Sequence, residues 1–174
     1  MRNTKFVILS VVFYTYISTA SVFAENINER LRAAKLPQTP KAKLIRYAKD
    51  RSWRVRKIIA GNQRTPADII AKLAQDSDPR VRTAVVRNLR APLSVLLKMT
   101  NDKSDAVRHS LAYCGYTPPK VLAKMVTDRD IDLRKKLAVN LNLPLTALKM
   151  LMNDDDDSVR SIATMMLEKR VKSK

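Results

Sequence analysis

One pattern of residues recurs along this chain at a constant spacing, the one that separates Asp50 from Asp76. Each copy has an Asp, and six positions later an Arg that directly follows a Val or Leu. The Asp column consists of Asp50, Asp76, Asp102, Asp128 and Asp154, and the Arg column of Arg56, Arg82, Arg108, Arg134 and Arg160. A Pro keeps the same spacing at Pro40, Pro66, Pro92, Pro118 and Pro144. A fixed period of about 26 residues is typical of a solenoid, in which each unit buries its apolar face only against its neighbours.

Each repeat is predicted to contain two short helices. The first, here called the Pro helix, begins at the repeated Pro, and a Thr such as Thr65 precedes it as a candidate cap. Asp68 follows Thr65 at the spacing of a capping box. Apolar residues recur along this helix at spacings of three and four, the pattern of a buried helical stripe.

The second helix, here called the Asp helix, begins two residues after the repeated Asp, at a Ser or Asp such as Asp78. It ends near an Asn such as Asn88, a residue that tolerates a left-handed exit conformation. No strand-period alternation is present. The sequence therefore predicts an all-α fold, a right-handed α-solenoid of about five two-helix repeats, each as long as the period.

The repeated unit resembles that of the leucine-rich repeat variant family, and it is similar to HEAT-like repeats. The resemblance rests on Asp-x-Asp-x-x-Val-Arg-x-x-Val-x-x-Asn followed by Thr-Pro-x-x-x-Leu-x-x-Leu-Ala, over about residues 38 to 168. The period is slightly longer than in the variant repeats and much shorter than in HEAT units. The cysteine cluster that holds an iron–sulfur centre in one variant-repeat protein has no counterpart, because Cys114 is the only cysteine. The resemblance implies an α-solenoid and no particular function.

Two interpretations apply to the Arg column. Its guanidinium groups form either an anion-binding ladder or a set of structural ion pairs. The resemblance to HEAT-like repeats favours the second, since the equivalent Arg there pairs with the repeated Asp and ties neighbouring units together. The one-to-one match between the two columns favours it as well. Such pairs fix register more than they add stability.

A second basic column lies on the Pro helices. It consists of Arg46, Lys72, Lys98 and Lys124, and Met150 ends it. Because packed helices lie about 8–10 Å apart, these side chains are predicted to form a row along one face. Arg64 and Arg90 share another column with Tyr116 and Asn142, near the start of the Pro helices. These Lys and Arg residues are the candidates for binding an anion or a partner, and the alternative is an ordinary solvated face.

The chain begins with the pattern of a secretory signal peptide. Arg2 and Lys5 precede an uncharged run over residues 6–17, and small residues follow up to Ala24. The uncharged run is too short for a comfortable membrane span, so we expect cleavage near Ala24 rather than an uncleaved anchor. We divide the chain into a signal peptide (1–24) and one α-helical repeat domain (25–174). This domain is expected to have a degenerate first half-repeat from Glu25 to Leu36 and a basic C-terminal tail that frays, in a periplasmic or secreted protein.

Cleavage removes two of the 34 basic residues and none of the 16 acidic ones, which leaves a net charge of +16. That excess favours an anionic partner or surface, or repulsion between copies. A single cysteine excludes an intramolecular disulfide, so the apolar interior has to stabilise the fold.

Four other features carry no strong indication of a site. The acidic run over residues 154–157 lacks the alternating spacing and the Gly turn of a calcium loop, and it lies at a helix start. His109 occupies a surface column with no spacing typical of a catalytic triad. Cys114 replaces an Asn near a helix end and is expected to be half-buried. Trp53 either shields the N-terminal end of the stack or anchors a partner. No catalytic, cofactor or metal site is predicted.

The sequence leaves three functions open. The first is an exported, non-enzymatic scaffold that binds a protein partner along one face, by analogy with other repeat folds. The alternative is binding to a polyanion, such as nucleic acid, a phosphate-rich envelope polymer or an anionic surface, through the Lys/Arg row. The third is an enzyme of the kind found among HEAT-like DNA glycosylases, for which a chain with one Trp offers few candidate residues. We expect no stable membrane insertion after cleavage, and the oligomeric state stays open.

Overall fold

The computed structural model describes residues 26–172, which form eleven α-helices and no strand within that range. The expected signal peptide lies outside the described residues. The Pro helices are α3 (Lys41–Tyr47), α5 (Ala67–Leu73), α7 (Leu93–Met99), α9 (Pro119–Lys124) and α11 (Leu145–Leu151). The Asp helices are α2 (Ile27–Lys35), α4 (Trp53–Gly61), α6 (Pro79–Val86), α8 (Asp105–Tyr113), α10 (Ile131–Val139) and α12 (Asp157–Lys172).

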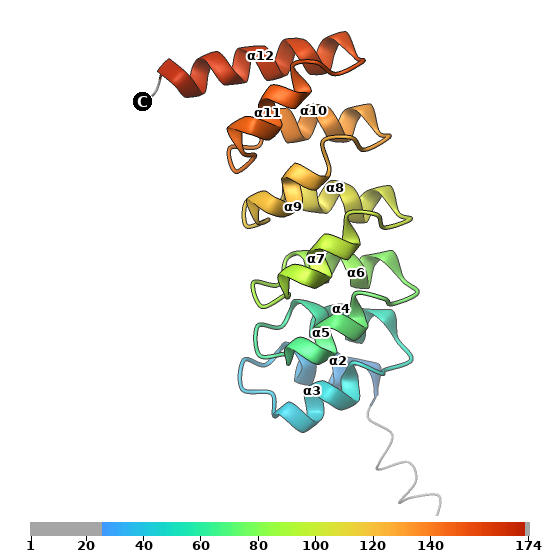
Figure 1. The fold of residues 1–174 in the computed structure, drawn as a ribbon. Helices are drawn as coiled ribbons and strands as arrows, with labels where there is room; N and C mark the ends of the chain where they lie inside the picture. Colours follow the sequence, from blue (N-terminus) through green and yellow to red (C-terminus); the bar gives the residue numbers. More distant parts are fainter. Residues whose placement is uncertain (1–25, 173–174) are drawn as a thin grey trace, which may run out of the picture.

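The two kinds of helix form two rows that rise together from α2 to α12 (Figure 1). Consecutive Asp helices pack against one another along the whole stack, and the Pro helices lie beside them as a second layer. The prediction of an all-α repeat solenoid is therefore confirmed. Its right-handed sense stays a prediction.

A continuous apolar core runs between the rows because each repeat buries the same positions. In the Asp helices the residue before the repeated Arg is 0% exposed in every copy, as Val55, Val81, Val107, Leu133 and Val159. In the Pro helices, the equivalent residues Leu44, Ile70, Leu96, Leu122 and Leu148 are at most 6% exposed. Burial of a side chain of this size contributes about 1.5–3 kcal/mol, and the covering surface comes from the neighbouring repeat.

The repeated Arg and Asp join consecutive repeats. The first four Arg of the column, and Arg30 before them, each form an ion pair with the Asp found 20 residues further along the chain, at 2.6 to 2.8 Å. The pairs of this Arg–Asp ladder are Arg30–Asp50, Arg56–Asp76, Arg82–Asp102, Arg108–Asp128 and Arg134–Asp154. No side chain in them is more than 16% exposed. The first α-helix, α2, thus takes part in the ladder through Arg30.

Each pair also fixes the start of an Asp helix. Arg82 donates from Nε and Nη2 to the two carboxylate oxygens of Asp102, at 2.7 and 2.8 Å, and from Nη1 to the backbone carbonyl of Asp76, at 2.6 Å. Asp102 also accepts the backbone N–H of Ser104, at 2.8 Å. Burial opposes ionisation of Asp102, but these hydrogen bonds and the positive charge of Arg82 hold its pKa below the ordinary value.

The Pro helices begin one residue later than predicted, and their Thr residues have another role. Pro66 precedes the first residue of α5, and no side chain caps the helix, neither Thr65 nor Asp68. Thr65 is buried, and its hydroxyl donates to the carbonyl of Ile59 at 2.6 Å. It therefore adds a second hydrogen bond to a carbonyl in the last turn of α4, which also accepts the backbone N–H of Asn62 at 3.1 Å.

The Asn residues at the ends of the Asp helices do not adopt the predicted left-handed conformation, since no described residue has a positive φ. Asn88 instead donates to the carbonyl of Ala60 in the preceding repeat, at 2.7 Å, and accepts the N–H of Arg90, at 2.9 Å. Asn62 and Asn140 donate in the same way, at 3.3 and 2.7 Å. These bonds form a second set of links between repeats, here called the Asn ladder.

The basic segment expected to fray is helical as far as it is described. Helix α12 continues to Lys172 because Arg170 stands where the other repeats have a Pro, so no residue blocks the helix. The guanidinium of Arg170 donates to the carbonyls of Leu143 and Asn140, at 2.8 and 2.9 Å. These bonds hold the end of α12 against the preceding repeat.

We expect Arg82→Ala to lower the free energy of unfolding by about 3 kcal/mol, because the change leaves Asp102 buried without its cation. Arg160→Ala is the matched control. Arg160 occupies the same column at the open end of the ladder and pairs with the exposed Asp157 of its own helix, so its loss should cost less. Chemical denaturation followed by circular dichroism measures both. Equal losses would contradict a role between repeats for Arg82.

Candidate partner-binding surfaces

The predicted row of cations lies on the solvent side of the Pro helices. Arg46, Lys72, Lys98 and Lys124 are exposed, and each lies in the last turn of its helix. A cation there interacts favourably with the negative end of the helix dipole. The Nζ of Lys124 also donates to the carbonyl of Leu97 on α7, at 3.1 Å. The row therefore has a local structural role as well as an exposed charge.

The rest of the Pro-helix surface is also basic. Every charged side chain on the Pro helices except Asp68 is a Lys or Arg, and Lys120 and Lys149 are among them. The sequence places both Lys120 and Lys149 on predicted Pro helices, but the column that begins with Arg46 does not include them.

Arg64 and Arg90 do not join this row. They lie in the loops that connect an Asp helix to the next Pro helix, here called the exit loops, so the length of a Pro helix separates them from Lys72 and Lys98. Arg64 donates to the carbonyl of Pro37 at 3.2 Å, and Arg90 is exposed. The structure thus divides the candidate cations into two groups at opposite ends of the Pro helices.

Large apolar side chains are exposed next to Arg64 and Arg90. Leu36, Leu89, Tyr116 and Leu141 are 47%, 66%, 77% and 74% exposed. All four lie where an Asp helix ends or in the exit loop that follows it. These four residues with Arg64 and Arg90 are here called the exit edge. The repeat pattern gives the positions of these residues in the sequence. It does not reveal that apolar side chains are exposed at successive exit loops, which becomes evident only in the folded stack.

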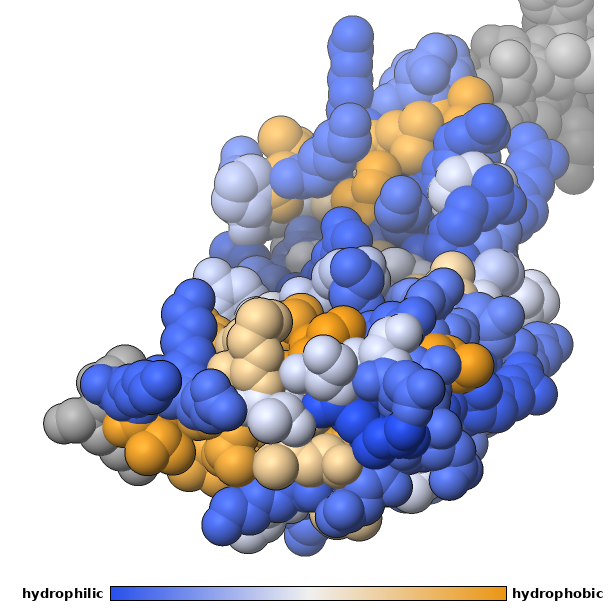
Figure 2. All heavy atoms as spheres, turned by 90° about the horizontal axis from the view of Figure 1, so that it is seen from above, coloured by the Kyte–Doolittle hydropathy of each residue, from blue (hydrophilic) through white to orange (hydrophobic). Residues whose placement is uncertain are grey.

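Apolar side chains also reach the surface at the C-terminal end of the stack. Figure 2 views this end from above and shows orange apolar side chains among blue hydrophilic ones. On α12, Met165 and Val171 are 57% and 62% exposed. No further repeat covers this helix within the described part of the chain.

Three of the four carboxylates in the acidic run at residues 154–157 make contacts within the fold. Asp154 pairs with Arg134, Asp157 pairs with Arg160, and Asp156 accepts the N–H groups of Ser158 and Val159. Between residues 26 and 172, no group of three or more His, Cys, Asp and Glu side chains is arranged to hold a metal ion.

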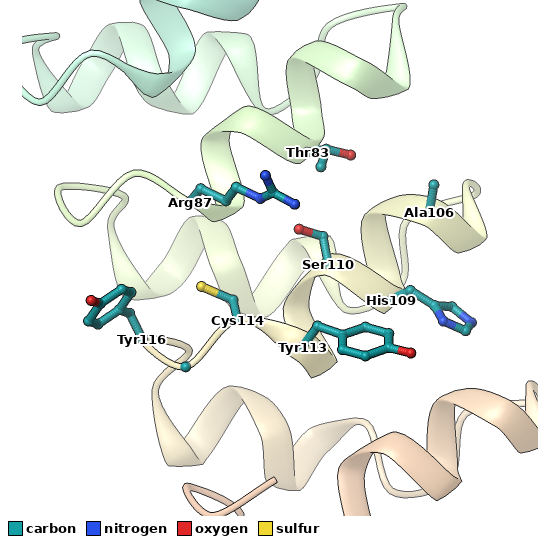
Figure 3. A pocket seen from close by; sticks show the side chains of 9 residues that line it. Thr83, Arg87, Ala106, His109, Ser110, Tyr113, Cys114 and Tyr116 are labelled. Carbon is teal, nitrogen blue, oxygen red and sulfur yellow. The ribbon is translucent and has the colours of Figure 1, made fainter.

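A hollow of about 640 Å³ lies between α6 and α8 and runs along α8 from its first turn to the exit loop. Thr83 and Arg87 line one side, and Ala106, His109, Ser110, Tyr113, Cys114, Gly115 and Tyr116 line the other (Figure 3). A smaller hollow of about 470 Å³ lies between α2 and α4, where Pro37, Ile58 and Arg64 form part of the wall. Both hollows open beside the exit edge.

The larger hollow coincides with a gap in the Asn ladder. Cys114 stands where Asn88 and Asn140 stand in the adjacent repeats, and it makes no hydrogen bond to the carbonyl of Val86. Ser110 lies one helical turn earlier, and its hydroxyl is buried with no hydrogen-bond partner in the described structure. The sequence identified Cys114 as a substitute for Asn, but it did not connect this change with Ser110.

His109 is half-buried, whereas its column suggested a simple surface position. Its Nε2 lies 2.7 Å from Oδ2 of Asp130, the residue that caps α10. The hydrogen bond from His109 outweighs partial burial and holds the pKa of Asp130 below its ordinary value. The imidazole points away from Ser110 and Cys114, so these side chains do not form a nucleophile–base pair (Figure 3).

Trp53 packs partly against the core, and the guanidinium of Arg80 covers its ring at 3.4 Å from the centroid. Arg54 lies 5.1 Å from the same centroid. Cation–π contacts of this kind contribute about 0.5–1 kcal/mol at exposed sites. The Trp53 ring therefore lies among cationic side chains of α4 and α6.

None of the described helices is both long enough and apolar enough to cross a membrane. No protein-family model matches the chain, and neither does any curated protein. Among solved structures, the chain is similar to an engineered protein determined by the Northeast Structural Genomics Consortium. The two are 18% identical with a TM-score of 0.43, over 81% of this chain and 88% of the other. Membership of the leucine-rich repeat variant or HEAT-like families stays a prediction.

We expect Cys114→Asn to raise the melting temperature, because the new amide can reach the carbonyl of Val86 and close the gap in the Asn ladder. The gain should be about 1 kcal/mol in the free energy of unfolding, the usual net contribution of one hydrogen bond. Cys114→Ser is the control, since its shorter side chain removes the thiol without restoring the amide. A Cys114→Asn variant no more stable than Cys114→Ser would contradict this account of the gap.

Proposed function

We propose that this protein is an exported, non-enzymatic repeat scaffold that binds a partner protein along the exit edge. The observation that carries the proposal is the exposure of Leu89, Tyr116 and Leu141 at equivalent loops of successive repeats. Tyr and Arg are enriched among the residues that contribute most to protein–protein affinity, and exposed Leu supplies apolar area around them. The leader pattern at residues 1–24 supports export to the periplasm or beyond the cell.

The spacing of these residues suits an extended contact. Each exit loop follows an Asp helix, and consecutive Asp helices pack directly against each other, so one loop lies beside the next. A partner segment that runs along the stack would meet an apolar residue at several repeats, with Arg64 and Arg90 between them. The smaller hollow beside Arg64 adds concave surface for its side chains.

Site-specific photocrosslinking tests this proposal in cells that produce the protein. A photoreactive residue at Leu89 or Leu141 should give one discrete protein adduct of constant mass. The same residue at Met150 is the control, because Met150 is 57% exposed but lies at the opposite end of the Pro helices. Leu89→Asp should abolish the adduct formed from position 141. Equal adducts from all three positions, or none from the exit edge, would refute the proposal.

Binding of a polyanion through the Pro-helix row is a second candidate function. The observation in its favour is that Arg46, Lys72, Lys98 and Lys124 face solvent on helices that carry a single acidic residue, Asp68. A contact of several cations with a polyanion releases counterions and weakens steeply as salt rises. An apolar contact along the exit edge does not depend on salt in this way.

Retention of the mature chain on heparin and on immobilised DNA across a salt gradient tests the second candidate. We expect Lys72→Glu with Lys98→Glu to abolish retention and leave folding intact. The control is Lys103→Glu with Arg129→Glu, which makes the same change in net charge at exposed positions outside the Pro helices. If both double variants elute with the parent, or if both lose retention equally, the row is not a specific site.

A further inference from the structure

The hollow between α6 and α8 is lined by hydrogen-bond donors without an acidic residue among them. Arg87 and Thr83 come from the side of α6, and Ser110, Tyr113 and Tyr116 come from α8 and its exit loop. Arginine only donates, and hydroxyl groups can donate to a strong acceptor. The polar groups of this wall therefore match an oxyanion better than a cation.

Ser110 is the most informative of these residues. It is 9% exposed, and its Oγ has no hydrogen-bond partner in the described structure. An unpaired buried hydroxyl destabilises a fold, and such groups in native proteins call for an explanation. Packing does not supply one, because Ala84 fills the equivalent position of the preceding repeat. In Figure 3 the hydroxyl points into the space between the helices, toward the side of Arg87.

Arg87 supplies the charge. Its side chain makes no hydrogen bond or ion pair to the described part of the chain, and its guanidinium extends across the hollow toward α8 in Figure 3. A planar guanidinium binds a carboxylate or phosphate through two parallel hydrogen bonds. Arg87 and Ser110 can thus contact one oxyanion from the two sides of the hollow.

The remaining wall is apolar and aromatic. Ala106, the sulfur of Cys114 and the ring of Tyr116 lie around the same space, and Tyr113 stands beside His109 with 6.3 Å between ring centroids. A volume of about 640 Å³ is within the range of small-molecule sites. We propose that this hollow binds a small aromatic oxyanion, a carboxylate or phosphate ester. Its charged group pairs with Arg87, an oxygen accepts the Ser110 hydroxyl, and its ring packs against Tyr116 and Cys114.

This site is separate from the partner proposed above. Tyr116 belongs to both surfaces, but Arg87 and Ser110 lie outside the exit edge, and ligand binding in the hollow does not require a partner protein. A failed crosslinking experiment and a failed ligand experiment therefore overturn different proposals.

Cys114 gives a direct readout because it lines the hollow and is the only cysteine of the chain. The probes are phenyl phosphate and benzoate, with the uncharged benzamide as their control. The rate of Cys114 alkylation by iodoacetamide is measured against probe concentration. For so small a ligand, we expect a Kd of about 1 mM. At ten times that Kd, the phosphate or carboxylate probe should slow the alkylation about tenfold. Protection by phenyl phosphate alone would assign a phosphate site, and protection by benzoate alone a carboxylate site.

Three variants decide whether protection comes from the proposed contacts. Arg87→Gln should abolish it, and Arg51→Gln, at an exposed Arg outside the hollow, should leave it unchanged. Ser110→Ala should weaken binding about twofold to tenfold while the free protein becomes no less stable, because the hydroxyl is unpaired without ligand. Benzamide protection equal to that of the anions, protection retained in Arg87→Gln, or no protection by either anion would each overturn the proposal.

Discussion

The bidentate pair between the Arg of one repeat and the Asp of the next is the interaction on which this stack depends. The same two side chains form an ion pair, fix the start of an Asp helix and link one repeat to the next. Both side chains are largely buried, so a repeat that packed in the wrong register would leave a guanidinium or a carboxylate buried alone. The apolar core supplies the stabilisation of the fold, but residues such as Val and Leu fit many arrangements. The Arg–Asp ladder selects one of them.

The ladder also decides where charge is left for other molecules. It places many of the acidic residues at the turns before the Asp helices, where Arg side chains and helix N-termini neutralise them. The Lys and Arg residues outside the ladder lie on the Pro helices, on the Asp helices and in the loops, and some of them, such as Arg80 and Lys135, pair with an Asp of their own helix start. The ladder pairs five Arg with five Asp, so the excess of positive charge among the described residues comes from side chains outside it, although nothing in the repeat pattern itself requires a basic protein.

The constant period was sufficient to predict the helix order, the buried columns and the starts of the Asp helices. It was not sufficient for side chains whose partners lie in another helix. Thr65 has the local pattern of a cap and Asn88 that of a left-handed exit, yet both bind a carbonyl of an earlier helix. His109 likewise contacts Asp130 in the next repeat. Local propensity describes one helix end at a time, so it does not reveal these contacts. For the candidate cations, the columns gave the residues and placed Arg64 and Arg90 near the start of the Pro helices, and the structure locates these two in the exit loops.

The hollow was not predicted for a further reason, since it lies where one repeat lacks a contact that its neighbours make. Cys114 lacks the amide of Asn88 and Asn140, so α6 and α8 lose a link near their C-terminal ends. Near their N-terminal ends, Arg82–Asp102 still joins the two layers. Because each repeat contacts only its neighbours, the change stays confined to one interface, and the repeats on either side keep their own Asn bonds. A solenoid can therefore carry a hollow in the middle of the stack without weakening the repeats beyond it. Such a site is to be sought where one repeat departs from the pattern at two positions one helical turn apart, as Ser110 and Cys114 do here.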